Sequence, residues 1–270
     1  MTPGWVRRGL FVFLYVVHMP LVEAQDSSTN SWTKPTSGLW EEPFWSSGGL
    51  PGAGQNLILV TNFGSKTLEI GASTTANFSN SLSLNRLTIE GPAETINGLF
   101  LNRAGTNVSL DVEWLTVGTN APVVSLSSAL TGYEAYISSP LLFAENSWLE
   151  IVRVLLSSDL TLSNSSASIG LLKVFPHRNV YQFQGRSDVN RLSLDGGSRF
   201  LLEGGKLSLR DLYLVHSSTF DSVTTNGTAT FVQTGVKQAS TQLCSACDHG
   251  PGAHTGANSC QQGDRCARGD

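Results

Sequence analysis

A short apolar motif recurs along this chain and constrains its fold more than any other feature. Apolar residues stand at offsets 0, 2, 5 and 7 in the segments 82–89, 110–117 and 207–214. Steps of two residues are typical of β-strands, in which alternate side chains point to the same face. The longer step in the middle predicts a bend or bulge that turns the second half of the motif back toward the core. Looser versions of the motif occur at 160–162, 192–194 and 229–232.

This recurrence helps to choose between two all-β folds. No segment shows sustained apolar spacing of 3.6 residues with helix caps, so we expect no helix. A β-sandwich holds many short strands without a repeated motif, whereas a parallel β-helix, or β-solenoid, stacks repeats of about 20–30 residues so that like positions align. The first two motifs begin at Leu82 and Leu110, 28 residues apart. The sequence therefore favours a β-solenoid, with a β-sandwich as the alternative.

The composition fits coils that are apolar inside and polar but mostly uncharged outside. Only 14% of the residues are charged, the net charge is −4, and 40% are hydrophobic. So few charges and so many apolar residues exclude a disordered polyelectrolyte. Because no basic excess is present to neutralise phosphates, we expect no nucleic-acid partner.

The N-terminal residues 1–24 have the features of a secretory signal peptide. Arg7 and Arg8 precede an apolar run over residues 10–17, and small residues lead to a cleavage site before Gln25. The apolar run is much shorter than the roughly 20 residues needed to span a membrane. We therefore expect a protein that is secreted or held at the cell surface, with no transmembrane segment after cleavage.

The mature chain divides into three parts by composition. Residues 25–37 form a polar leader, residues 38–236 a solenoid repeat domain, and residues 237–270 an irregular tail that contains cysteine. The repeat domain opens with a Trp-rich, Gly/Pro-rich stretch over residues 38–62. Because a solenoid needs both ends covered, we expect this stretch to be its N-terminal cap.

The cap also holds the candidate residues for carbohydrate contact, which are Trp40, Trp45, Glu41 and Glu42. Exposed indoles stack on sugar rings, and neighbouring carboxylates accept hydrogen bonds from hydroxyl groups. The alternative interpretation is that the indoles are buried in the cap and the carboxylates are solvated.

All four cysteines lie in the tail, at Cys244, Cys247, Cys260 and Cys266. Export favours two disulfides among them, with three possible connectivities. The pair Cys244 and Cys247 also supplies half of a tetrahedral zinc site, which either Cys260 and Cys266 or a histidine could complete. A redox dithiol is a further alternative. A fourth interpretation is that the tail is foreign to the fold, through an altered reading frame or a truncated gene.

Residues 37–59, with their Trp, Gly and Pro pattern, and the strand 87–92 resemble the bacterial secreted proteins that carry autotransporter-associated β-strand repeats, and related surface β-helices. The resemblance implies a parallel β-helix and a structural or adhesive role at the cell surface or outside the cell. It implies no cofactor and carries over no catalytic residues, so we do not expect an enzyme. The alternative function is a polysaccharide-binding or polysaccharide-degrading β-helix. The expected partners are cell-surface or extracellular polysaccharides or proteins.

Overall fold

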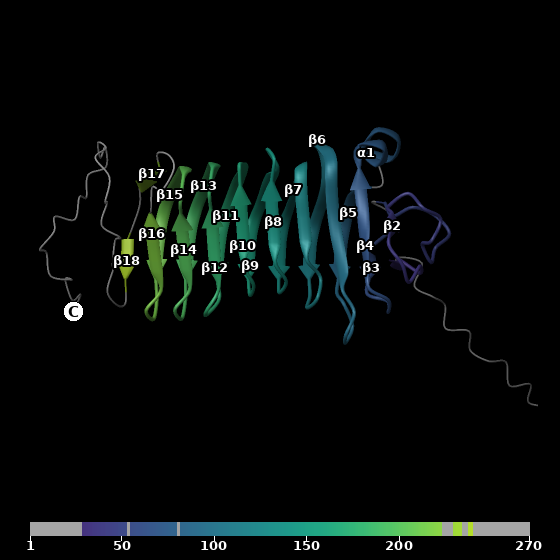
Figure 1. Ribbon diagram of the computed structural model, residues 1–270, viewed down its shortest axis with the longest axis horizontal. Helices are drawn as coiled ribbons and strands as arrows, with labels where there is room; N and C mark the ends of the chain where they lie inside the picture. Colours follow the sequence, from purple (N-terminus) through teal and green to yellow (C-terminus); the bar gives the residue numbers. More distant parts are fainter. Residues whose placement is uncertain (1–28, 53–54, 80–81, 223–228, 234–236, 240–270) are drawn as a thin grey trace, which may run out of the picture.

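A computed structural model describes residues 29–52, 55–79, 82–222, 229–233 and 237–239, and these residues form a parallel β-solenoid. The strands stack in sequence order along the longest axis of the molecule, from β2 at one end to β18 at the other (Figure 1). Every ladder between named strands is parallel. The predicted fold class is therefore confirmed, and the β-sandwich alternative is wrong.

Within the described residues, the solenoid contains 18 strands and one short helix. They are β1 (Thr29–Ser31), β2 (Gly38–Leu39), β3 (Leu57–Val60), β4 (Lys66–Gly71), α1 (Ala72–Phe78), β5 (Ser83–Ile89), β6 (Asn97–Val117), β7 (Val123–Ile137), β8 (Leu141–Ala144), β9 (Trp148–Leu156), β10 (Leu160–Ser163), β11 (Ser165–Val174), β12 (Asn179–Gln182), β13 (Gly185–Leu194), β14 (Arg199–Leu202), β15 (Gly205–Leu214), β16 (Thr219–Ser222), β17 (Ala229–Gln233) and β18 (Lys237–Ala239).

The bend predicted by the motif is present in the long strands. In β5 and β6 the ladder pairs Leu84 with Val112 and Arg86 with Trp114, and it skips the residue between them on each strand. The same skip recurs between β6 and β7, between β7 and β9, and on through β15. Apolar side chains on both sides of the bend are buried, so one long strand contributes two walls of the coil.

The core consists of apolar ladders that run along the solenoid axis. One of them joins Leu172, Leu192 and Leu212, which pair in register and are all buried. Successive members lie one strand spacing apart, about 4.8 Å. Each coil therefore buries its side chains against the coils before and after it, and stability depends on nearest neighbours.

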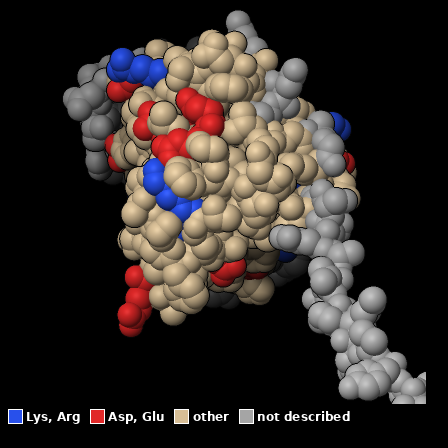
Figure 2. All heavy atoms as spheres, turned by 90° about the vertical axis from the view of Figure 1, so that its right-hand side faces the viewer, with Lys and Arg blue, Asp and Glu red and all other residues tan. Residues whose placement is uncertain are grey.

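The N-terminal end is closed by a cluster of indoles. Trp32, Trp40 and Trp45 are buried and pack edge to face, with ring centroids 5.1 Å apart for Trp32 and Trp45 and 4.9 Å apart for Trp40 and Trp45. The Nε1 of Trp45 donates a hydrogen bond to the carbonyl of Trp40 at 2.8 Å. Seen from this end, uncharged side chains cover most of the surface, and charged groups lie at a few places (Figure 2). The predicted Trp-rich cap is thus present.

Two strands of the solenoid lie outside the expected repeat domain 38–236. Strand β1 lies inside the expected polar leader 25–37, yet it pairs with β3 and buries Asn30, whose amide donates to the carbonyl of Gly49 at 2.9 Å. Polar composition hid this strand, because the buried side chain is an amide that makes hydrogen bonds. At the other end, β18 lies inside the expected tail and pairs with β15.

The expectation of no helix is wrong for residues 72–78, which form α1. The helix has seven residues, too few to display an apolar period of 3.6 in the sequence. It is tied to the cap by the hydroxyl of Thr74, which donates to a carboxylate oxygen of Glu41 at 2.6 Å.

A buried lysine at the start of β4 makes hydrogen bonds to the loop that precedes the strand. The ammonium of Lys66 donates to the carbonyls of Asn62 and Gly64 at 2.8 and 2.9 Å and to Oδ1 of Asn97 at 2.7 Å. The Lys66 residue is only 4% exposed, and this burial lowers the pKa of its amine from the usual 10.5. Three oxygen acceptors thus replace the water that the ammonium would otherwise bind.

The expected signal peptide, residues 1–24, and the four tail cysteines lie outside the described residues. In the part of the chain that is described, no helix has the length and apolar character needed to cross a membrane.

Candidate functional site

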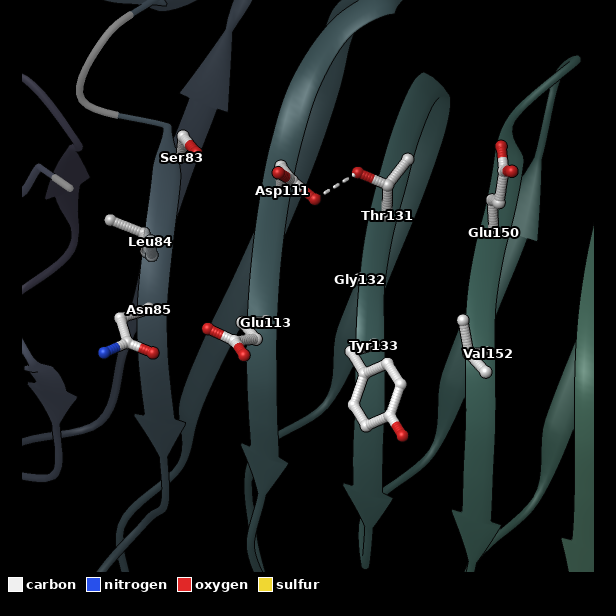
Figure 3. Close-up of a pocket in the computed structure, with 10 residues that line it drawn as sticks. All are labelled: Ser83, Leu84, Asn85, Asp111, Glu113, Thr131, Gly132, Tyr133, Glu150 and Val152. Carbon is white, nitrogen blue, oxygen red and sulfur yellow. Dashed lines mark hydrogen bonds between the residues drawn. The ribbon is translucent and has the colours of Figure 1, made fainter.

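A groove crosses four neighbouring strands, β5, β6, β7 and β9, on the outside of the solenoid. It has a volume of about 650 Å³. Two rows of side chains run across the strands, and two further positions, Leu84 and Gly132, lie between the rows (Figure 3). The first row is Ser83, Asp111, Thr131 and Glu150, and the second is Asn85, Glu113, Tyr133 and Val152. We call these ten residues the acidic groove.

The bend in the long strands produces the second row. These four residues are the ones that the ladders skip, between Leu84 and Arg86 on β5 and at the equivalent place on β6, β7 and β9. A residue that leaves the ladder at a bulge or bend has its side chain re-aimed. Here all four side chains line the outside, so the same local geometry places one residue from each coil along the groove.

A glycine forms part of the groove floor. Gly132 takes a ladder position at which its partners Val112 and Ile151 bury their side chains. A Cβ atom at Gly132 would lie 2.0 Å from the carbonyl oxygen of Val112, closer than any real contact. The close approach of the two backbones therefore requires glycine at this position.

One aromatic ring of the groove is open to solvent. Tyr133 is 50% exposed, and its ring packs edge to face with that of Trp114, with centroids 5.5 Å apart and planes at 66°. This edge-to-face contact supports the phenol ring from one side. The open part of the ring is available for stacking against a sugar or for contact with a cation.

Three carboxylates line the same groove. Asp111 accepts a hydrogen bond from the hydroxyl of Thr131 at 2.7 Å, and Glu150 accepts one from Nε1 of Trp148 at 3.0 Å. Glu113 is exposed. No lysine or arginine is among the ten groove residues. The nearby Arg153, one residue past the bend on β9, bonds Glu134 at 3.2 Å.

These carboxylates are spread along the groove rather than gathered at one point. Asp111 and Glu113 belong to β6 and Glu150 to β9, with β7 between them (Figure 3). Among the described residues, no group of three or more His, Cys, Asp and Glu side chains could hold a metal ion. The arrangement can therefore contact a ligand that extends across several strands.

The carbohydrate-contact residues expected from the sequence lie elsewhere, in the cap. Trp40 is 0% exposed and Trp45 is 4% exposed, so neither indole presents a face for sugar stacking. Glu41 accepts from Thr74, and Glu42 accepts from the ammonium of Lys34 at 2.6 Å and from the backbone NH of Leu39 at 3.0 Å. The structure therefore brings these four residues together as packing and anchoring groups, and the expectation of sugar contact at Trp40 and Trp45 is not supported.

Some of the groove residues occupy the variable positions of the repeated motif, where the apolar pattern does not distinguish them. Asp111, Glu113 and Trp114 fill the variable positions of the unit 110–117, between the apolar residues that identified it. They form a groove only through the register of neighbouring coils, which places Tyr133 and Glu150 beside them. Because the coils differ in length, a single repeat does not predict that register.

Comparison of the chain with known protein families, with curated proteins and with solved structures found no match. The resemblance to autotransporter-associated repeat proteins therefore stays a prediction.

Proposed function

We propose that this protein is an exported, non-enzymatic β-solenoid module with a structural or adhesive role at the cell surface or outside the cell. The observation that supports the proposal is a continuous parallel ladder that carries an open groove of exposed aromatic and acidic side chains on its side. A ladder in which every coil packs on the next is suited to hold a contact surface at a fixed place.

A second function, polysaccharide binding, is favoured by the groove itself. The exposed Tyr133 ring, the three carboxylates and the hydroxyl and amide groups of Ser83, Asn85 and Thr131 combine stacking with hydrogen bonding. The groove crosses four strands, a span of about 14 Å at about 4.8 Å per strand spacing. That span matches a short run of sugar rings better than a single small molecule, so the proposed adhesion acts through a polymeric ligand.

The test is retention of the purified chain on a panel of insoluble polysaccharides and cell-wall preparations. The wild type is expected to be retained on at least one matrix, and Tyr133→Ala is expected to lose about tenfold in affinity, the value of one aromatic contact. Tyr136→Ala is the matched control, because Tyr136 lies on the same strand, is 47% exposed, and is not a groove residue.

Three results would contradict the proposal. These are no retention on any matrix, equal losses in the two tyrosine variants, or release of new sugar ends from a retained polysaccharide. Export is tested separately, by sequencing the N-terminus of the protein recovered outside the cells, where Gln25 is the expected first residue.

A further inference from the structure

We infer that the ligand of the acidic groove is a polysaccharide that carries free amino groups, such as a glucosamine polymer. This inference rests on the proposed function, since it names the ligand class of the same groove. It starts from the charge of the lining, where three carboxylates stand without a lysine or arginine among the ten groove residues. A polymer of uronic acids would bring like charges together along this surface, whereas ammonium groups would compensate the carboxylates.

The exposed aromatic ring points to the same chemistry by a different route. The face of a tyrosine attracts ammonium groups within about 6 Å of the ring centroid, and acidic neighbours strengthen the preference for a cation. Tyr133 lies in the second row of the groove beside Glu113, with Asp111 and Glu150 in the first row (Figure 3). A sugar bearing an amine can therefore stack its ring on Tyr133 and direct its ammonium to a carboxylate.

The spacing of the carboxylates favours a repeating ligand over a single amine. Asp111 and Glu150 occupy the same row on β6 and β9, separated by Thr131 of β7. They are two strand spacings apart, about 10 Å. A linear amino-sugar polymer presents amines at intervals comparable to this distance, so one chain laid across the strands meets more than one carboxylate.

A basic peptide is the competing cationic ligand, and the strand pairing argues against it. Extended peptides commonly bind by adding a strand to a free sheet edge. Three of the four groove strands, β6, β7 and β9, are paired on both sides along the groove, whereas β5 pairs there with β6 and meets β3 only at Leu87–Ile89. Most of the groove therefore offers exposed side chains rather than unpaired backbone groups, which suits a ligand recognised through ring stacking and hydroxyl groups.

The experiment is calorimetric titration of the full chain with three soluble oligomers: a glucosamine hexamer, its fully N-acetylated counterpart and a galacturonate hexamer. At about pH 5.5, where sugar amines and ordinary carboxylic acids are charged, the glucosamine hexamer is expected to bind at least tenfold more tightly than the acetylated one. The galacturonate hexamer is expected not to bind. The preference should shrink as salt is raised, because screening weakens exposed charge pairs.

Two sets of charge-removing variants separate a local from a general effect. The triple variant Asp111→Asn, Glu113→Gln and Glu150→Gln is expected to lose the preference for the free amine. The control variant Glu90→Gln, Glu94→Gln and Glu145→Gln removes the same net charge from exposed positions outside the groove, and it should keep the preference.

The outcomes distinguish this inference from the proposed function. If the acetylated hexamer or the galacturonate hexamer binds as well as the glucosamine hexamer and Tyr133→Ala weakens that binding, the groove is a contact surface but the amine preference is wrong. An equal loss in both triple variants would also overturn the inference. Oligolysine binding as tightly as the glucosamine hexamer, without any need for Tyr133, would assign the groove to basic peptides. If no oligomer binds, the inference fails here, and the polysaccharide panel decides the proposed function separately.

Discussion

Coils on the two sides of β9 differ in their regularity. The repeat length is the sequence separation of two residues that pair in neighbouring coils. Between β5 and β9 it falls from 28 residues, for the pair Ser83 and Asp111, to 20 for Leu110 and Leu130 and to 19 for Ala129 and Trp148. From β10 to β16 each pairing adds 20 residues. We call the first part the variable half and the second the regular half. The same bend occurs in both halves, yet only the variable half contributes residues to the acidic groove.

The difference lies in the positions that the apolar motif leaves free. At the bend, the variable half carries Asn85, Glu113, Tyr133 and Val152, whereas the regular half carries Gly170, Asn190 and Arg210. The fold thus provides an outward row on every coil, and the side chains in that row determine what the surface can bind. The apolar positions specify the solenoid, and the intervening positions specify its contacts.

The largest effect is expected from breaking a ladder in the regular half. Leu192 is fully buried between Leu172 and Leu212, and the same ladder continues in the variable half through Val154, Ala135 and Leu115. Leu192→Ala should therefore lower the free energy of unfolding by about 2–5 kcal/mol, through lost burial and the cavity left behind. Urea unfolding followed by circular dichroism measures this loss.

Leu192→Met is the control for that prediction, because it conserves volume and should cost less than about 1.5 kcal/mol. A loss below about 1 kcal/mol in Leu192→Ala would show that the regular half does not depend on close packing of its ladder.

The next effect is expected at the buried ammonium of Lys66, on β4 just before the variable half. Lys66→Met removes the donor to Asn62, Gly64 and Asn97. The carbonyl of Asn62 keeps the hydrogen bond from Nδ2 of Asn97 at 3.0 Å, so the two acceptors that lose their donor are the carbonyl of Gly64 and Oδ1 of Asn97. Because a buried acceptor without a donor costs about 1–3 kcal/mol, we expect a total loss of about 3 kcal/mol in the free energy of unfolding. A stability equal to the wild type would mean that water replaces the ammonium without penalty.

Lys66 also gives stability a particular pH dependence. Its pKa in the folded chain is below the usual 10.5, so between the two values the unfolded chain binds more protons. The contribution of Lys66 to stability therefore rises with pH across that window. The difference in unfolding free energy between the wild type and Lys66→Met should grow as the pH approaches 10.5, and a shrinking difference would contradict the assignment.

The same contrast explains which features could be predicted from the sequence. The solenoid and its bend follow from the apolar residues of units such as 82–89, because a buried ladder demands a repeated apolar position. The groove does not follow, because it depends on which variable positions of different coils become neighbours. The pairing of Thr131 with Glu150 is fixed by coil lengths that vary, and no single unit contains both.

The cap illustrates the opposite case. The Trp and Glu residues of the cap suit either sugar contact or burial of the indoles, and in the structure the indoles of Trp40 and Trp45 belong to the core. Residue type alone does not distinguish a buried aromatic from an exposed one. The exposed aromatic of the groove, Tyr133, stands beside a glycine in an unremarkable stretch of sequence, and its exposure comes from the bend.

A smaller effect is expected from filling the floor of the groove. Gly132→Ala places a Cβ against the backbone of Val112, so the two strands must move apart, at a cost of about 2 kcal/mol. Ligand retention should fall as well, because the rows on either side are displaced. Gly49→Ala is the control, since a Cβ there meets nothing within 4 Å. Full stability and retention in Gly132→Ala would show that the close backbone approach is not required.

The smallest effect is expected in the cap, which closes the variable half. The hydrogen bond from Lys34 and that from the backbone of Leu39 lower the pKa of Glu42 below its usual 4.5. A carboxyl whose pKa is lower in the folded chain stabilises that chain at any pH above its pKa in the unfolded chain. This contribution is lost as the pH falls through the pKa in the folded chain. Glu42→Gln should therefore lower the free energy of unfolding by about 0.5 kcal/mol at neutral pH, the scale of an exposed ion pair, and the difference from the wild type should disappear in strong acid.

Glu94→Gln, at an exposed position, is the control and should match the wild type at both pH values. A Glu42→Gln deficit that persists unchanged in acid would assign the effect to packing in the cap rather than to the charge of Glu42.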